Sequence, residues 1–121
     1  MYGVLARRAD FLRVYQRHSR VSGQYFTLLV HPCYTEAPRA GLVVSRKVGK
    51  AVRRNLVKRR LRAYLREHIE HTTMQRDIIV IARPGSAEAT WQQHCQDLDR
   101  LFARGMRAIA KSAPCIEPSG A

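Results

Sequence analysis

Residues 77–83, DIIVIAR, form the feature that most limits the fold of this chain, a nearly continuous apolar run rich in Ile. A strand with one face in water alternates apolar and polar residues, whereas this run predicts a strand that is buried on both faces. The run ends at Pro84 and Gly85, a pair that is typical of turns. The chain is therefore expected to bury this strand in a layered fold of strands and helices.

Periodicity and turn residues predict the elements around this strand. Three segments with apolar residues at helical spacing are expected to form helices, at residues 9–17, 51–71 and 91–111. Two segments rich in aromatic and β-branched residues are expected to form strands, at residues 25–31 and 40–46, and to pair as a hairpin. The order helix, strand, strand, helix, strand, helix predicts an α+β fold, an α/β sandwich.

The segments between these elements are polar or carry turn residues. Residues 19–24 predict a turn or one extra short strand, Pro32 is expected to end the first strand, and residues 33–38 form a polar loop. Residues 112–121 contain two Pro and a Gly and predict a disordered tail. A length of 121 residues suits one domain, so residues 1–111 are expected to form a single one.

The charge of the chain limits its partners. Twenty-two Lys and Arg residues against nine Asp and Glu residues give a net charge of +13, which a bound polyanion would relieve. Nucleic acid is the first candidate and an anionic membrane surface is the second. The apolar runs are too short to span a bilayer, and charged residues interrupt the N-terminal segment, so a cytoplasmic protein is expected. Cys33, Cys95 and Cys115 lack CxxC spacing and are expected to be free thiols.

Residues 39–66 hold eleven of the twenty-two basic residues and no acidic residue. A solvated helix face usually interleaves both signs, so a merely solvated basic helix is the weaker interpretation. The residues Arg54, Lys58, Arg62 and Arg66 recur every four positions and form one cationic stripe along the predicted helix. A membrane-surface helix would need a large exposed apolar face, and the segment's single aromatic residue is a tyrosine. The segment therefore predicts a nucleic-acid surface.

Aromatic and basic residues also gather in the first predicted helix. Phe11 and Tyr15 lie one turn apart, with Arg13 and Arg17 around them. Two interpretations stay open for these rings. They anchor a short helix to the core, which the residues alone favour, or they stack on bases of single-stranded RNA while the arginines hold phosphates. Phe26, at the start of a predicted strand, has the same two interpretations.

A long motif runs through the basic segment. It consists of RAG at 39–41, VSRKVG at 44–49, AV at 51–52, RN at 54–55, KR at 58–59 and Arg62. This pattern resembles the protein subunit of bacterial ribonuclease P, whose signature reads V-S-K-K-V-G-x-A-V-x-R-N-x-x-K-R-x-x-R. The resemblance extends to residues 10–11, 14–15, 26–28 and 77–83. Ala63 departs from the acidic or amide residue that the family usually has there.

The resemblance implies a mixed sheet flanked by helices, a left-handed crossover through the basic helix, and two RNA-binding surfaces. The surface for the catalytic RNA subunit would comprise Arg46, Lys47, Lys50, Arg53, Arg54, Asn55, Lys58, Arg59 and Arg62. The surface for the 5′ leader of precursor tRNA, a cleft between the first helix and the sheet, would comprise Phe11, Arg13, Tyr15, Arg17 and Phe26.

The resemblance also implies that the RNA subunit carries the chemistry and binds most of the Mg²⁺. The partners would then be ribonuclease P RNA and precursor tRNA, with no obligate protein partner, and the protein would supply no catalytic residue and no metal ligand. The residues agree, because His68 and His71 lack an evident third ligand, and His94 and Cys95 are sequence neighbours that point apart on a helix.

Two other functions are compatible with a basic chain of this length. A structural RNA-binding protein, such as a ribosomal protein or an RNA chaperone, would bind RNA without stimulating tRNA processing. A metal-dependent nuclease would need clustered acidic residues to hold the metal, and the nine acidic residues of this chain are scattered, which disfavours it.

Overall fold

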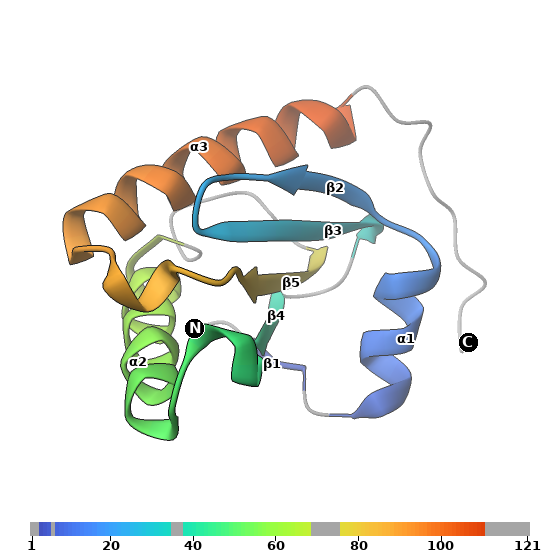
Figure 1. Ribbon diagram of the computed structural model, residues 1–121. Helices are drawn as coiled ribbons and strands as arrows, with labels where there is room; N and C mark the ends of the chain where they lie inside the picture. The colour runs from blue at the N-terminus through green and yellow to red at the C-terminus, as the bar shows by residue number, and fades with distance from the viewer. Residues whose placement is uncertain (1–2, 6, 35–37, 69–75, 111–121) are drawn as a thin grey trace.

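The structure, a computed structural model, describes residues 3–5, 7–34, 38–68 and 76–110. Five strands form one mixed sheet in the order β1-β4-β5-β3-β2 (Figure 1). The strands are β1 (Gly3–Val4), β2 (Ser19–Ser22), β3 (Phe26–Tyr34), β4 (Arg39–Val43) and β5 (Arg76–Ala82). The helices are α1 (Arg8–Gln16), α2 (Ala51–His68) and α3 (Trp91–Ala110), with 3-10 turns η1 (Arg46–Val48) and η2 (Ser86–Glu88). The predicted α+β class is confirmed.

The strand β5 lies in the middle of the sheet and is buried along nearly its whole length, as its apolar run predicts. It pairs parallel with β4, where Leu42 lies opposite Val80, and antiparallel with β3, where Leu28 lies opposite Val80. Parallel neighbours require a crossover, and α2 provides it between β4 and β5. The handedness of this crossover stays a prediction.

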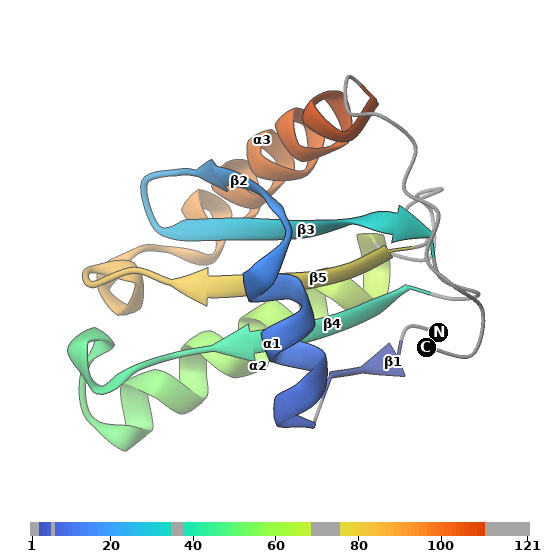
Figure 2. The ribbon, with the colours of Figure 1, turned by 90° about the vertical axis from the view of Figure 1, so that its right-hand side faces the viewer.

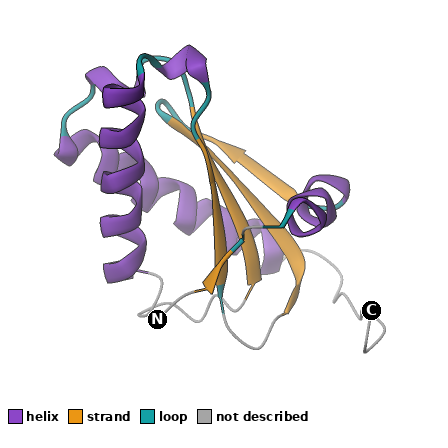
Figure 3. Cartoon of the chain, turned by 90° about the horizontal axis from the view of Figure 1, so that it is seen from below, coloured by secondary structure: helices purple, strands orange, loops and turns teal. Residues whose placement is uncertain are grey.

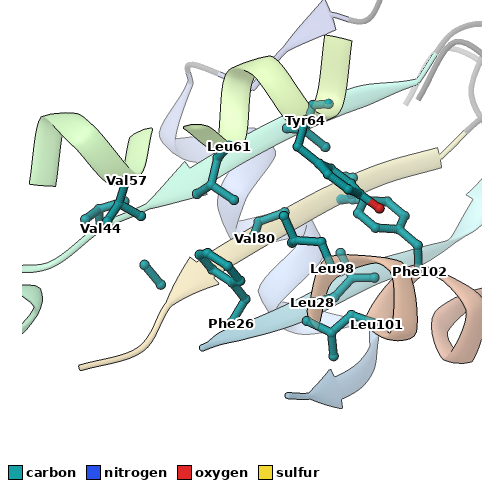
Figure 4. Packing of buried hydrophobic residues seen from close by; sticks show 14 of the residues in the cluster. Phe26, Leu28, Val44, Val57, Leu61, Tyr64, Val80, Leu98, Leu101 and Phe102 are labelled. Atoms are coloured by element: carbon teal, nitrogen blue, oxygen red, sulfur yellow. The ribbon is translucent and has the colours of Figure 1, made fainter. Parts of the chain in front are cut away.

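Helices α2 and α3 cover one face of the sheet, and the main apolar core lies beneath them (Figure 3). In this core Phe26 and Val80 from the sheet lie close to Leu61 and Tyr64 of α2 and to side chains of α3 (Figure 4). The α3 side chains are Leu98, Leu101 and Phe102, which follow one another at helical spacing. Burial of each large side chain stabilises the fold by roughly 1.5–3 kcal/mol.

Helix α1 crosses the opposite face of the sheet and covers only part of it (Figure 2). A smaller buried cluster lies under α1 and consists of Leu5, Val14, Leu29 and Ile79. Phe11, Val43 and Ile81 pack against this cluster and are only partly buried. The sheet therefore has one face closed by two long helices and one face that stays partly open beside a short helix.

The pairing of the strands differs from expectation. The predicted hairpin is wrong, because β5 lies between β3 and β4, and the partner of β3 in a hairpin is β2. Pro32 does not end β3, which continues to Tyr34 after a register shift that begins at Val30. Such an irregularity allows a strand to contain a residue without an N–H. The strand β1 was not predicted, since two residues are too few to form a pattern.

Two predicted segments fall outside the described part of the chain. The predicted basic helix reached residue 71, and the described helix α2 ends at His68. The predicted tail at residues 112–121 likewise lies outside the described residues.

Candidate RNA interface

Three exposed cations lie at the entrance to α2. Arg46 and Lys47 belong to η1, and Lys50 directly precedes the helix. Between them Gly49 has a φ of 149°, a conformation that residues with a side chain rarely adopt, so this turn requires glycine. The first turn of α2 contains no acidic residue. Because the N–H groups of a helix N-terminus point outward, this end of α2 favours phosphate groups.

Part of the predicted stripe lies on the side of α2 that faces strands β1 and β4. Lys58 and Arg62 line a hollow of about 220 Å³ on this side. The other residues that line the hollow are Val4, Leu5, Ala40 and Leu42. Arg54, one turn before Lys58, has a buried Nε without a hydrogen-bond partner among the described residues. The β1 side of this hollow could not be predicted, because a strand of two residues is too short to form a sequence pattern.

Two other arginines of α2 attach the helix to the η2 segment. Arg53 lies 2.6 Å from the carboxylate of Glu88, with both side chains more than half exposed. Arg60 donates a hydrogen bond to the carbonyl of Ala89 at 2.9 Å. Arg53 was predicted to bind the RNA subunit, which stays a prediction, and in the structure its guanidinium group also has a partner within the protein. The sequence pattern could not reveal this, because Glu88 lies 35 positions further along the chain.

The outer face of α2 carries the remaining predicted residues, Asn55 and Arg59, which are both exposed. They line a second hollow, of about 350 Å³, together with Val52, Arg53 and Leu56. The predicted residues of α2 thus lie on three sides of one helix, at the β1 edge, on the outer face and beside η2.

Several acidic side chains are used inside the protein. Asp97 accepts hydrogen bonds from the backbone N–H groups of Gln24, Tyr25 and Phe26, at 3.0 to 3.1 Å. Asp99 accepts a hydrogen bond of 2.6 Å from the hydroxyl of Tyr64. Asp97 is thus used inside the protein, whereas Glu88 lies at the surface and compensates the charge of Arg53 on α2. The positive field that attracts a polyanion is reduced beside Arg53 by this carboxylate.

The ring of Phe11 attaches α1 to the sheet at Gly41. A Cβ atom at Gly41 would lie 2.7 Å from two atoms of this ring, so only glycine allows so close an approach. Tyr15, one turn later, is 40 % exposed, and its ring centroid lies 6.4 Å from that of Phe11. The two rings therefore have different roles in packing: Phe11 anchors the helix, and Tyr15 presents a large part of its surface to solvent.

The carboxylate of Asp77 holds α1 and two strands together. It is fully buried and accepts hydrogen bonds from Arg39 Nε and Nη2, at 2.8 and 2.6 Å, and from Arg13 Nη1 at 3.0 Å. The hydrogen bond to Asp77 raises the pKa of Arg39 above its ordinary value. Arg13, predicted to contact the leader, therefore attaches α1 to β5. Arg17, just after α1, is exposed.

Phe26 was predicted to contact the leader, and the structure contradicts this. Its side chain is fully buried in the main core on the α2 and α3 face, away from α1. Its ring meets the buried ring of His94, with centroids 5.0 Å apart. Residues of a strand alternate between the two faces, and the sequence pattern alone did not specify which face Phe26 occupies.

The histidines and the cysteine of the described helices have structural surroundings. His68 stacks on Tyr64 with centroids 4.0 Å apart. His94 lies in the core, where burial lowers its pKa. Cys95 is a free thiol whose pKa is raised by burial. Within the described ranges, His, Cys, Asp and Glu side chains do not gather in groups of three that could hold a metal ion.

The comparisons with known proteins agree with this geometry. The model of the Ribonuclease P family matches residues 3–105, which is most of the chain. The chain belongs to the ribonuclease P protein family. A ribonuclease P protein component from Desulfovibrio desulfuricans is 41 % identical over 87 residues, which cover 70 % of this chain and 67 % of that protein.

Solved structures from this family have the same fold. The ribonuclease P protein of Staphylococcus aureus superimposes with a TM-score of 0.76 at 32 % identity, covering 92 % of this chain and 97 % of that one. The ribonuclease P protein of Thermotoga maritima gives a TM-score of 0.74 at 32 % identity, covering 83 % and 94 %. Membership in this family associates the chain with ribonuclease P, tRNA processing and RNA binding, rather than with a structural RNA-binding role. None of the helices in the described ranges is long and apolar enough to cross a membrane.

Proposed function

We propose that this chain binds the catalytic RNA subunit of ribonuclease P through α2 and η1, and the 5′ leader of precursor tRNA beside α1. The observation that carries the proposal is the cationic surface of η1 and α2, where residues 46–66 hold ten basic and no acidic residues. The family assignment supports the enzyme and its RNA partner. The RNA subunit would carry the reaction and hold Mg²⁺, and the protein would act from the cytoplasm as a binding and positioning subunit.

The physical role of the chain in this proposal is to join two polyanions. The RNA subunit and the precursor tRNA repel each other, and Mg²⁺ at high concentration would otherwise have to screen that repulsion. A protein with a net charge of +13 reduces the repulsion by releasing condensed counterions from both RNAs. Affinity should then fall steeply with salt, by about a thousandfold between low and moderate salt for about six phosphate contacts.

The leader surface is proposed to lie where the sheet is open beside α1. Tyr15 is its stacking residue, because its ring is the more exposed of the two aromatic rings on α1. Arg17 lies two positions further on, where its charge suits a phosphate. Phe11 and Arg13 would support this surface from within, by attaching α1 to the sheet. Stacking and phosphate contacts tolerate any base, so leader binding should depend little on sequence.

Reconstitution tests the proposal. Cleavage of a precursor tRNA by a bacterial ribonuclease P RNA would be measured at low Mg²⁺, with and without this protein. We expect cleavage to be stimulated, and we expect the protein alone to give none. Tight RNA binding without stimulation would instead support a structural RNA-binding protein. Cleavage by the protein alone would overturn the assignment of the chemistry to the RNA.

A charge-matched pair of variants locates the RNA-subunit surface. The first variant replaces Arg54, Lys58 and Arg62 by Ala, and the control replaces three exposed arginines of α3, Arg100, Arg104 and Arg107. Both variants lose three positive charges. In a filter-binding titration the first should flatten the slope of log affinity against log salt by about two to three, and the control by much less. Equal slopes for the two variants would refute the α2 surface.

A further inference from the structure

An apolar spot lies in the middle of the basic surface of α2. Val52 is 81 % exposed, more than any other large apolar side chain in the described part of the chain. Leu56, one turn later, is partly buried. Both line the hollow of about 350 Å³ on the outer face of α2, together with Arg53, Asn55 and Arg59. Exposure of Val52 to water is unfavourable, so a partner that covers it would gain binding free energy.

The packing of α2 does not account for this spot. Val57 and Leu61 form the inner face of the helix, and at 100° per residue Val52 lies about 140° around the helix from Val57. Neither Val52 nor Leu56 belongs to the two apolar clusters of the described core. The two side chains therefore form an outward patch that the fold itself does not need.

The surroundings of the patch indicate the kind of partner that covers it. Arg59 and Asn55 are exposed at its edges, so an apolar floor is bordered by a cation and an amide with hydrogen-bond donors. Arg53 lies at a third edge, where its contact with Glu88 holds it toward η2. A nucleotide has the matching parts, because its base has an apolar face and its phosphate is an anion.

Two other partners fit the patch less well. A second copy of this chain would bring a net charge of +13 against the same charge, which opposes association. A membrane-surface helix usually inserts a broad apolar face with large aromatic residues, and here the exposed apolar residues are one valine and part of one leucine.

We infer that the Val52–Leu56 hollow receives an unstacked nucleotide of the ribonuclease P RNA, with the base against the two apolar side chains and the phosphate beside Arg59. This inference rests on the proposed function. It extends that function by adding a base contact to a surface that would otherwise bind only the charge of the RNA. Such a contact favours places where the RNA exposes a base, such as loops and bulges, over uniform duplex.

The salt dependence of binding distinguishes an apolar contact from a charged one. Affinity for ribonuclease P RNA would be titrated across a series of KCl concentrations for Val52→Ser and for Arg59→Gln. We expect Val52→Ser to weaken binding roughly three- to tenfold at every salt concentration with an unchanged slope, because an apolar contact releases no counterion. We expect Arg59→Gln to flatten the slope by about 0.7 to 0.9.

A matched variant controls for the loss of an exposed apolar side chain from a helix. Leu12 is 44 % exposed and lies on α1, on the other face of the sheet, so Leu12→Ser should leave affinity for the RNA subunit unchanged. Thermal melting of each variant without RNA should match the parent protein. This would show that a change in affinity does not come from unfolding.

Three results would overturn the inference, each in a different way. Unchanged affinity for Val52→Ser, with tight binding by the parent protein, would remove the base contact and leave the proposed function standing. A parent protein that is dimeric in sedimentation and becomes monomeric with Val52→Ser would make the patch a protein interface. A flattened slope for Val52→Ser would show that the substitution disturbs the cations rather than an apolar contact. Failure of the parent protein to bind the RNA at all would refute the proposed function itself.

Discussion

Replacement of Asp77 by Asn would remove a buried charge that two arginines share. The carboxylate of Asp77 is completely inaccessible, whereas the side chains of Arg13 and Arg39 are 31 % and 35 % exposed. Asn keeps the shape and one acceptor oxygen, so it can retain part of the three hydrogen bonds from the arginines. The loss of the charge also leaves two positive groups close together without their common counterion.

The expected cost follows from these contacts. Hydrogen bonds to charged groups contribute about 1.5–3 kcal/mol each, and one or two of the three would be lost. Breaking a fully buried ion pair costs roughly 3–5 kcal/mol, and partial exposure of both arginines reduces this figure. We therefore expect Asp77→Asn to lower the free energy of unfolding by about 2–4 kcal/mol. This is a large part of the stability of an ordinary domain, roughly 5–15 kcal/mol.

Urea denaturation at neutral pH measures this cost, and Glu88→Gln is its matched control. Glu88 lies 2.6 Å from Arg53, the same separation as in the closest contact between Arg39 and Asp77, but the side chains of Glu88 and Arg53 are 59 % and 57 % exposed. An exposed pair contributes at most about 1 kcal/mol. Similar losses of unfolding free energy in the two variants would refute the reasoning, because the two ion pairs have the same separation and differ in burial.

Three further predictions concern α1 and the core. Gly41→Ala should lower the free energy of unfolding by about 1–3 kcal/mol, measured by urea denaturation, because its Cβ would overlap the ring of Phe11. Adding Phe11→Leu should restore part of this loss. Tyr15→Ala should weaken binding of precursor tRNA about tenfold in the holoenzyme, with little effect on mature tRNA; equal losses would show that the ring does not contact the leader. His94 donates its Nε2–H to the carbonyl of Ser86, and burial lowers the pKa of its imidazole in the folded protein. As the pH falls below about 6.5, the histidine of the unfolded chain is therefore protonated before that of the folded protein. Stability should therefore decrease on acidification below that pH, and His94→Gln should reduce the steepness of this decrease in melting temperatures measured from pH 7 to pH 5.

Local patterns were sufficient to predict the element types. The apolar run at residues 77–83 predicts a doubly buried strand, and β5 is that strand, one position earlier. The periodic segments predict α2 and α3 within a few residues. The order of the strands could not be predicted, because the pairing of β5 with both β3 and β4 depends on contacts between distant residues. A hairpin between β3 and β4 satisfied every local pattern and was still wrong.

In the candidate site, too, local spacing was predictable and contacts between distant residues were not. The four-residue spacing of Lys58 and Arg62 correctly predicts that they share one edge of α2, because helical geometry fixes it. The spacing does not reveal that Arg13 is held by Asp77, since that partner lies 64 positions away. It does not reveal the exposure of Val52 either, because an apolar residue in a helix usually faces a core. The sequence therefore predicts which side chains share one edge of a helix. Which of them have partners within the protein depends on the fold.

The central position of β5 has a consequence for synthesis of the chain. The β2–β3 hairpin and β4 are made first, and within the described sheet nothing joins β3 to β4 until β5 emerges between them. The whole of α2 is translated before β5, so this helix is available while the sheet is still in two parts. Closing the sheet requires the ends of this long crossover to meet, at a cost in chain entropy. An RNA partner that binds only the folded form, as proposed above, would favour that closure by mass action and would couple folding of this chain to assembly with the RNA.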